Sequence, residues 1–581
     1  MIRTVALALA FLALTAGDAQ VSAPPGNAPR PLARDHAAPE AAHAFAKAPQ
    51  PWPQGSAVSG LVLAGERLGS ITGRGTRQFQ VVVVPGFALA DLAALEESGA
   101  VGLLVPGAGP ETSEELARAG LERGEARNSL RGGSPPGDPL LEARTGALGS
   151  ADGPAIYVGL PEGDRQANDR RYPIVVVGRG YEGVLTSEST RIPGLVSVVD
   201  VAPTALGTDG ALGWETEENG AAELAALDER IDDNNSTRLW AVLLACALLL
   251  LLAFVRPPAA VPALATLLLA NLALGLAGVS AAWAVLLFLG LALLAGASLP
   301  ASLRRPLALG FTLAGVLAAY LLVLGLDGAA VALSPLGPTQ NARFYGLSNL
   351  LETFLLVPAL GGAALLGTRL GRPAFAAVAV LALVTVAGSS FGADGGGAVV
   401  LAAGFVTLAL LASSDRRRAL VLAPLAAVAA VILVLVVDLA AGTSSHVTEA
   451  VGEGPVGLAG DLRDRVVLSY ERVTADWYVA LVVTALFAAF ALLVTRTLAR
   501  RGLAAESAVP LALAVAVGAS LAVNDSPLDV LLVGAVAYLA ADRGMLAARW
   551  PGRSRSRSSS LSSSWRRDAA AARPPRPSRK P

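Results

Sequence analysis

The chain has 581 residues, of which 53% are hydrophobic and 16% are charged, and its formal net charge at pH 7 is −1. This composition excludes a wholly soluble protein and indicates an integral membrane protein with a sizeable polar portion. The near-neutral charge argues against nucleic acid as a partner. The single cysteine, Cys246, lies inside an apolar run, which excludes a disulfide framework and a thiolate metal site.

The first 23 residues have the pattern of a secretory signal peptide. Arg3 precedes an apolar run, and small residues follow, with cleavage expected after Ala19 or Ala23. An uncleaved membrane anchor is the alternative, and both send the following segment outside the cell. Residues 24–54 are rich in proline and alanine and are predicted to be a tether.

Residues 55–207 have the pattern of a soluble α/β domain. Short β-branched runs predict buried strands at 81–84, 101–105, 156–158 and 174–177. Helices are predicted between them, at 91–98 and 112–121, and this order of strand, helix and strand favours a parallel sheet. Residues 208–238 are then a linker to the membrane domain.

Two stretches of this domain resemble a known family. Residues 81–87 with 100–104, and residues 186–204 ending in Asp200-Val-Ala-Pro-Thr204, are similar to the opening and closing segments of an alkaline-phosphatase-like domain. That extracytoplasmic domain precedes the membrane part of multispanning envelope proteins of high-GC Gram-positive bacteria, a family of unknown activity. The resemblance implies the architecture and candidate sites, and no activity.

The domain departs from the active members of that superfamily, which hold two metal ions with Asp and His ligands and attack with Ser or Thr. It has no histidine between Pro51 and Val255, and its first predicted strand ends in Val84-Pro-Gly-Phe87 without a metal-binding Asp. We therefore predict a degenerate domain, a pseudoenzyme. Thr112 and Ser113 are expected to cap a helix, and Asp200 to set a turn or cap.

Eleven apolar segments of membrane-spanning length follow. They are residues 239–255, 259–278, 281–298, 307–326, 344–367, 374–390, 398–413, 419–442, 478–494, 506–523 and 528–541. The predicted fold is thus a polytopic α-helical membrane domain of about eleven spans, residues 239–541, preceded by the extracytoplasmic α/β domain.

Arginines predict the orientation in the cell membrane. They occupy every second connection, at Arg256, 304–305, 369–372, 416–418, 496–501 and from Arg543 onward. The positive-inside rule makes these connections cytoplasmic, so the α/β domain lies outside. The basic tail, residues 542–581, is predicted to be disordered and cytoplasmic, where it binds anionic lipid headgroups.

Three polar motifs lie in connections predicted to face outside. The candidates for binding or catalysis in them are Arg343, Tyr345, Asn349 and Glu352 in the first, Asp394 in the glycine-rich second, and Asn524 and Asp525 in the third. His446 lies on the same side, in the longest outer loop, where residues 462–473 are amphipathic and predicted to lie along the interface. Ionisable groups at membrane depth are costly unless paired or hydrated, which makes these residues functional candidates.

Helical spacing suggests how the first motif is arranged. If a helix begins near Phe344, then Tyr345, Asn349 and Glu352 share one stripe, and Glu352 lies about 12 Å along the helix. A carboxylate there must face a cavity or pair with a cation, of which Arg343 is the nearest in sequence. The glycine-rich second motif is expected to let backbone approach a partner closely.

The three motifs, Arg-Phe-Tyr-Gly-x-x-Asn, Gly-Ala-Asp-x-Gly-Gly and Asn-Asp-Ser, also resemble motifs of the envelope family. In the family, a glutamate directly follows the asparagine of the first motif. In this chain that position, after Asn349, is Leu350, and Glu352 follows two positions later.

Three functional hypotheses follow. The first is envelope biogenesis, in which an outward cavity binds a lipid-linked glycan or another anionic substrate for transfer or translocation. Arg343 would then clamp the anion, and Asp394 and Asp525 would hold Mg²⁺ or another divalent cation or act as a base. The second is a proton-coupled secondary transporter that uses Glu352 and Asp394. The third is a non-catalytic scaffold that recruits envelope enzymes. Membrane lipids are partners in all three.

Overall fold

The computed structural model describes residues 79–547, except 126–128, 132–137, 179, 209, 218, 341–343, 394, 414, 441–453, 475 and 525. The predicted signal segment and tether, and the tail from residue 548, lie outside the described residues. We call residues 79–215 the sheet domain and the helices from residue 220 onward the helix bundle.

The sheet domain contains all four strands that were predicted. They are β1 (Gln80–Val83), β2 (Gly99–Val105), β5 (Ala155–Val158) and β7 (Tyr172–Val177). The main sheet has the order β10-β8-β2-β7-β5-β1-β4, and β9 also pairs with β2. Its further strands are β4 (Arg144–Thr145), β8 (Gly183–Thr186), β9 (Leu195–Ser197) and β10 (Gly213–Glu215), while β3 (Glu111–Thr112) and β6 (Gln166–Ala167) pair separately.

The sheet is mixed, so the prediction of a parallel sheet is wrong. Strand β1 is parallel to β4 and β5, but β7 is antiparallel to both β2 and β5. The physical reason lies in the connection from β5 to β7, which contains the short β6 and no helix. The crossover to a parallel neighbour is usually a helix packed on the sheet, and the connection of residues 159–171 returns without one, so β7 is antiparallel to β5.

Short helices complete the sheet domain: η1 (Leu89–Ala94), α2 (Glu114–Arg123), η2 (Ser129–Arg131), η3 (Val198–Asp200) and α3 (Val201–Leu206). Ser113 caps α2, since its side chain accepts a hydrogen bond from Leu116 N over 3.2 Å, whereas Thr112 lies in β3. Asp200 accepts a bond from Ser197 N over 2.7 Å and thereby caps η3. Both capping roles follow the sequence expectation for Ser113 and Asp200.

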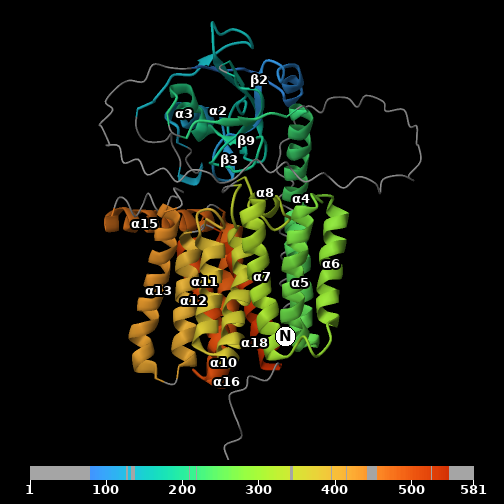
Figure 1. The fold of residues 1–581 in the computed structure, drawn as a ribbon, viewed down its shortest axis with the longest axis vertical. Coiled ribbons are helices and arrows are strands. Elements are labelled where there is room, and N and C mark those ends of the chain that lie inside the picture. Colours follow the sequence, from blue (N-terminus) through green and yellow to red (C-terminus); the bar gives the residue numbers. More distant parts are fainter. Residues whose placement is uncertain are drawn as a thin grey trace, which may run out of the picture. The chain divides into compact units, whose positions relative to one another are not determined.

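The helix bundle has a helix on each of the eleven apolar segments (Figure 1). The helices are α4 (Gly220–Val255), α5 (Pro257–Leu276), α6 (Ala282–Ser298), α7 (Pro306–Leu326), α8 (Gly328–Ala332), α9 (Asn349–Leu356), η4 (Val357–Gly361), α10 (Gly362–Leu370), α11 (Arg372–Ala387), α12 (Gly395–Ala412), α13 (Arg416–Ala440), α15 (Gly454–Thr474), α16 (Trp477–Arg501), η5 (Ala505–Ser507), α17 (Ala508–Val523) and α18 (Pro527–Ala547).

Seven helices among the described residues are long and apolar enough to cross a membrane. They are α4, α5, α7, the continuous run Asn349–Leu370, α12, α16 and the run Ala505–Val523. The other four predicted spans, α6, α11, α13 and α18, are helical, and their crossing of the membrane stays a prediction.

Helix α4 connects the two parts of the chain. The segment predicted as a linker, residues 208–238, contains β10 and the first half of this 36-residue helix. Leu224 and Ile231 of α4 are buried in the core of the sheet domain, and Cys246 and Leu249 are buried in the core of the bundle. The cysteine therefore has the structural role expected of a small buried residue.

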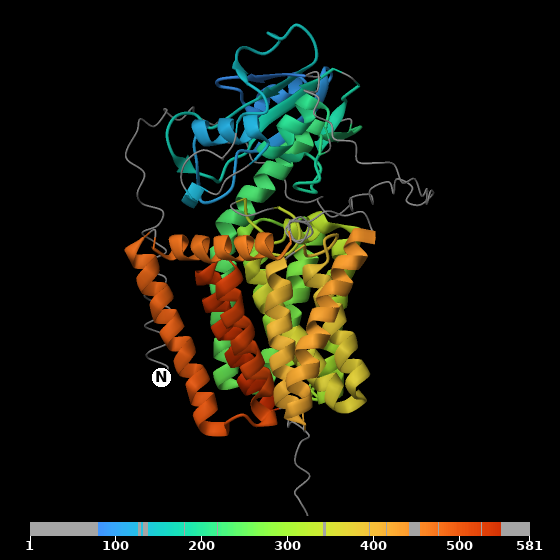
Figure 2. The same cartoon turned by 90° about the vertical axis from the view of Figure 1, so that its left-hand side faces the viewer.

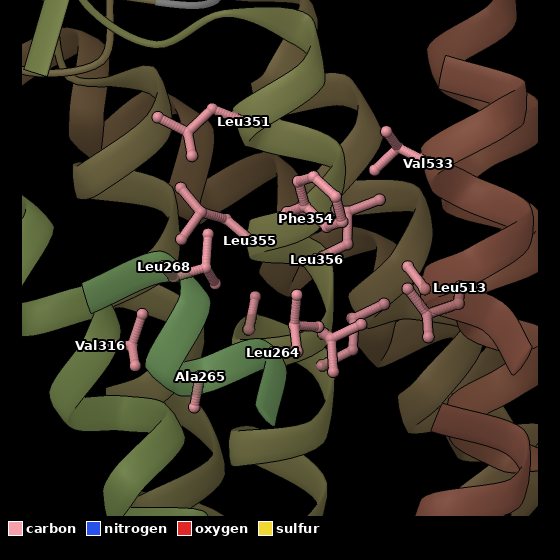
Figure 3. Packing of buried hydrophobic residues seen from close by; sticks show 14 of the residues in the cluster. Leu264, Ala265, Leu268, Val316, Leu351, Phe354, Leu355, Leu356, Leu513 and Val533 are labelled. Atoms are coloured by element: carbon pink, nitrogen blue, oxygen red, sulfur yellow. The ribbon is translucent and has the colours of Figure 1, made fainter. Parts of the chain in front are cut away.

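The run from α9 to α10 is the central helix of the bundle. In its most apolar window 94% of the residues are buried, against 11% to 78% for the other six candidates. Leu351, Phe354 and Leu355 of α9 pack among Leu264 and Leu268 of α5, Val316 of α7, Leu513 of α17 and Val533 of α18 (Figure 3). Every residue from Leu350 to Leu356 is buried, so Glu352 lies within this core.

Helix α15 lies across the ends of the bundle helices and not along them (Figures 1 and 2). It contains the amphipathic residues 462–473, and this orientation is the one expected of a helix at a membrane interface.

Candidate functional site

The two ends of the bundle differ in composition. At one end Arg501 pairs with Asp542 over 2.7 Å, Arg416 donates to Leu503 O over 2.9 Å, and Arg543 lies 4.2 Å above the ring of Phe254. Connections predicted to be cytoplasmic thus meet there, and we call this the arginine end. The polar motifs meet at the opposite end, which we call the motif end. Which end faces the outside of the cell stays a prediction.

Glu352 is a buried carboxylate in the first turn of a helix. Its exposed fraction is 1%, and α9 begins only three residues earlier, with Ser348 as the N-cap. The Ser348 hydroxyl accepts a hydrogen bond from Leu351 N over 3.1 Å. The positive end of the helix dipole favours a negative charge at this position, which offsets part of the cost of burial.

The predicted stripe of Tyr345, Asn349 and Glu352 is wrong in one member. Helix α9 starts at Asn349 because Gly346 has a φ of +75° and Leu347 N donates to Gly392 O over 3.2 Å, which holds the chain in a turn. Tyr345 is therefore outside the helix. Glu352 lies about 4.5 Å along the helix axis from its first residue, not about 12 Å.

Asn524 donates one hydrogen bond to Glu352. Its amide Nδ2 donates to Glu352 Oε2 over 3.2 Å and to Ser520 Oγ over 2.8 Å, and only 3% of Asn524 is exposed. Ser469 of α15 donates from its hydroxyl to Asn524 O over 2.5 Å. The first turn of α9, the end of α17 and α15 are thus joined by polar contacts inside an apolar core.

A second set of contacts lies beside this one and brings in a cation. Asn349 Nδ2 lies 3.4 Å from Ser526 Oγ, and Arg472 Nη1 donates to the same hydroxyl over 3.3 Å. Arg472 was not among the sequence candidates. Its place near the end of an amphipathic outer segment is the one signal that pointed to it.

The glycine-rich motif lets α12 approach the carboxylate. A Cβ atom on Gly397 would clash with Val386 Cγ1 and would lie 3.1 Å from both Cδ and Oε1 of Glu352. The expected close approach of backbone is therefore present, and its partners are Val386 of α11 and Glu352.

The sheet domain also reaches the motif end. Arg191 Nη1 donates to Ser389 O over 2.6 Å, and its guanidinium lies 4.3 Å above the ring of Tyr345. Ser389 precedes the glycine-rich motif and Tyr345 precedes α9. Sequence reasoning missed Arg191, because it lies 198 residues before Ser389 and no local pattern marks it.

A buried polar network holds the loop before α9 to the sheet domain. Gln340 Nε2 donates to Asn168 Oδ1 over 2.9 Å and to Arg170 O over 2.7 Å. Arg171, whose side chain is 1% exposed, pairs with Asp228 and Asp232 of α4 over 2.6 Å and 2.7 Å. The sheet domain thus fixes the residues that lead into the first motif.

Four sequence candidates, Arg343, Asp394, His446 and Asp525, lie outside the described residues. Within the described part of the chain, no group of three or more His, Cys, Asp or Glu side chains is arranged to hold a metal ion. The divalent cation at Asp394 and Asp525 stays a prediction from sequence.

Neither a protein-family model, nor a curated protein, nor a solved structure matches this chain. The chemistry of the site is therefore the basis for assigning a function.

Proposed function

We propose that this chain is an envelope-biogenesis membrane protein that binds a lipid-linked or other anionic substrate at an outward-facing polar site. The site consists of Glu352 and Asn524 with their neighbours Ser520, Asn349, Ser526 and Arg472, and we call it the Glu352–Asn524 site. The observation that carries the proposal is the hydrogen bond between the buried Glu352 and the buried Asn524.

The burial of Glu352 is the first step of the argument. A carboxylate among apolar helices costs several kcal/mol unless protein groups replace its hydration. Here Asn524 at the end of α17 donates to the carboxylate, α15 fixes Asn524, and the first turn of α9 contributes the positive end of its dipole. A carboxylate retained at such a cost is a functional candidate by default.

The charges around the site support an anionic substrate. The guanidinium of Arg472 donates a hydrogen bond to Ser526 and so lies beside the site. The first turn of α9 contributes the positive end of its dipole. In the proposal Arg343 adds a further cation to clamp the anion, and Asp394 and Asp525 bind Mg²⁺ or another divalent cation with the substrate phosphate.

The sheet domain is proposed to be the degenerate alkaline-phosphatase-like domain of the envelope family. Its support is the sequence resemblance and the capping roles of Ser113 and Asp200. In this proposal it guides the substrate, since it holds the loop before α9 through Gln340.

One observation favours a second candidate, a proton-coupled transporter. The π-helical turn η4, which contains Pro358, directly follows α9 in the most buried candidate span. Such turns are frequent at functional sites, and transporters place binding sites at interrupted helices. Glu352 would then carry the coupled proton.

The experiment replaces the wild-type protein in its native cells by Glu352→Gln or Asn524→Ala and profiles envelope lipids and glycans in each leaflet. Asp542→Asn is the matched control, because Asp542 is also a mostly buried carboxylate but pairs with Arg501 at the arginine end. At equal protein levels, the two site variants accumulate a substrate and the control does not.

The position of the accumulated substrate separates the two activities. Accumulation in the inner leaflet supports translocation, and accumulation in the outer leaflet supports transfer. Wild-type profiles for both site variants would favour a non-catalytic scaffold instead. Proteoliposomes with the wild-type protein can instead be assayed for proton uptake. Uptake that is lost in Glu352→Gln would favour the transporter.

A further inference from the structure

We infer that Arg191 of the sheet domain is a binding residue of the Glu352–Asn524 site and contacts a phosphate group of the substrate. The inference rests on the proposed function and deepens it, because it names the chemical class of the substrate and adds a residue from the other part of the chain.

The position of Arg191 is the first argument. Its two partners, Ser389 O and the ring of Tyr345, belong to the segments that lead into α12 and into α9. Tyr345 is four residues before Asn349 of the site, and Ser389 belongs to the connection that leads into α12 and Gly397, the glycine beside Glu352. The hydrogen bond from Leu347 N to Gly392 O joins these two segments, so Arg191 contacts both segments that lead to the site.

The backbone of Arg191 is the second argument. Its φ is +55°, a left-handed conformation that costs free energy for a residue with a Cβ atom and that glycine or asparagine adopts more readily. The turn is held by the hydrogen bond from Arg191 N to Ser187 O over 2.9 Å. An arginine kept in a strained turn indicates that its side chain is needed there.

The availability of its charge is the third argument. Arg191 is exposed, and among the described residues no carboxylate pairs with it. Asp200, the buried carboxylate of η3, instead accepts hydrogen bonds from the hydroxyls of Ser187 and Ser189, each over 2.8 Å. The ring of Tyr345 fixes the plane of the guanidinium, and Ser389 O occupies Nη1, which leaves the other N–H groups to bind a ligand.

The geometry points to phosphate. A planar guanidinium with a fixed orientation binds the oxygens of phosphate in pairs, which a lysine does not. With Arg472 as a second cation on α15, the site favours a group with more than one negative charge, such as a phosphate monoester or a pyrophosphate. This group belongs either to a lipid headgroup or to a soluble molecule.

The test measures binding by calorimetry, with the full chain in nanodiscs of zwitterionic lipid. Inorganic pyrophosphate is the soluble probe and dodecyl phosphate is the lipid-like probe. Arg191→Gln keeps an N–H donor for Ser389 O but removes the charge, so the fold is preserved while the affinity falls by about tenfold or more. Arg165→Gln, which removes an exposed arginine paired with Glu111, is the matched control and leaves the affinity unchanged.

The probe that binds identifies the source of the phosphate. Binding of dodecyl phosphate alone assigns a lipid-borne phosphate, and binding of pyrophosphate alone assigns a soluble one. Either result supports the inference when Arg191→Gln weakens the binding of that probe. Equal affinity in wild type and Arg191→Gln overturns it, as does a wild-type protein that binds neither probe. If Glu352→Gln leaves the envelope unchanged while Arg191→Gln weakens binding, the proposed function fails and the phosphate site stands.

Discussion

The amide of Asn524 donates a hydrogen bond to Glu352 Oε2 over 3.2 Å, although 172 residues separate them in the chain. This contact joins the first turn of α9 to the end of α17, and both side chains are more than nine-tenths buried. Ser520 and Ser469 hold Asn524 from two further directions. Because the surroundings are apolar, loss of one partner leaves the other without a replacement from water.

Asn524→Ala is therefore expected to lower the free energy of unfolding by about 1–3 kcal/mol, the usual cost of a buried group that loses its partner. Unfolding in mixed micelles, followed by circular dichroism, measures the change. Ser298→Ala is the control, since its exposed hydroxyl donates only to Leu294 O of its own helix, and a loss of less than about 1 kcal/mol is expected. Equal stability of Asn524→Ala and wild type would contradict this account.

Gly397→Ala is expected to displace both Val386 and Glu352. The new Cβ atom would clash with Val386 Cγ1 and would lie 3.1 Å from Cδ and Oε1 of the Glu352 carboxylate. Overpacking of this kind costs about 1–3 kcal/mol, and envelope profiles should match those of Glu352→Gln.

Gly518→Ala is the matched control for that change. Gly518 is also helical, in α17, but no atom lies within 4 Å of its Cβ position, so this variant should be neutral or more stable by up to about 1 kcal/mol. If both alanine variants behave alike, the close approach of α12 to Glu352 has no role.

Arg171→Met is expected to loosen α4 and the loop before α9 from the sheet domain, because Arg171 Nη1 also donates to Gln340 Oε1 over 3.4 Å. The change leaves Asp228 and Asp232 without their cation. We expect a cost of about 3 kcal/mol, the lower end for a buried pair, because Asp232 is 60% exposed. Amide hydrogen exchange in residues 333–340 should become faster. Arg165→Met, which breaks an exposed ion pair, should leave the free energy of unfolding and the exchange rates unchanged. Exchange rates unaltered by Arg171→Met would argue against the role of Arg171 in holding the loop.

Asp200 makes the stability of the sheet domain depend on pH. Burial raises the pKa of this carboxyl above its ordinary value of 3.8, and hydrogen bonds from Ser197, Ser189 and Ser187 offset the rise only in part. The protonated form is therefore favoured by folding. Its stabilising effect is complete below pH 3.8 and is lost as the pH rises through the raised pKa of the folded protein.

The thermal midpoint, measured from about pH 3.5 to about pH 8, tests the effect. In Asp200→Asn the fall in stability with rising pH should be smaller than in wild type. Asp164→Asn, at an exposed position, should keep the wild-type slope. An unchanged slope in Asp200→Asn would rule out the titration of this group.

Local patterns predicted the elements well. The eleven apolar runs became helices and four β-branched runs became strands, because length and side-chain type act within each segment. The direction of β7 was not predictable from its own residues, since it depends on the connection from β5. The start of α9 was missed because the turn at Gly346 is held by Gly392, which is distant in sequence.

Some members of the site were predictable from the sequence, but their pairing was not. Glu352 and Asn524 were noticeable as polar residues beside apolar runs, yet nothing in either segment indicated that they bind each other. Arg191 had no such signal, and Arg472 had only its place in an amphipathic segment, because charged residues are ordinary in a soluble domain and in such a segment. Their roles depend on contacts that only the folded chain provides.

The central claim, that the Glu352–Asn524 site opens to the outside of the cell, is tested most directly by cysteine labelling. Cys246 is fully buried and does not interfere with labelling of an introduced cysteine. Ser526→Cys reports on the motif end. Ser302→Cys, at an exposed position in an arginine-containing connection, reports on the arginine end. With a membrane-impermeant maleimide, Ser526→Cys should react in intact cells and Ser302→Cys only after permeabilisation. The reverse pattern would contradict the proposed orientation and, with it, an outward-facing site.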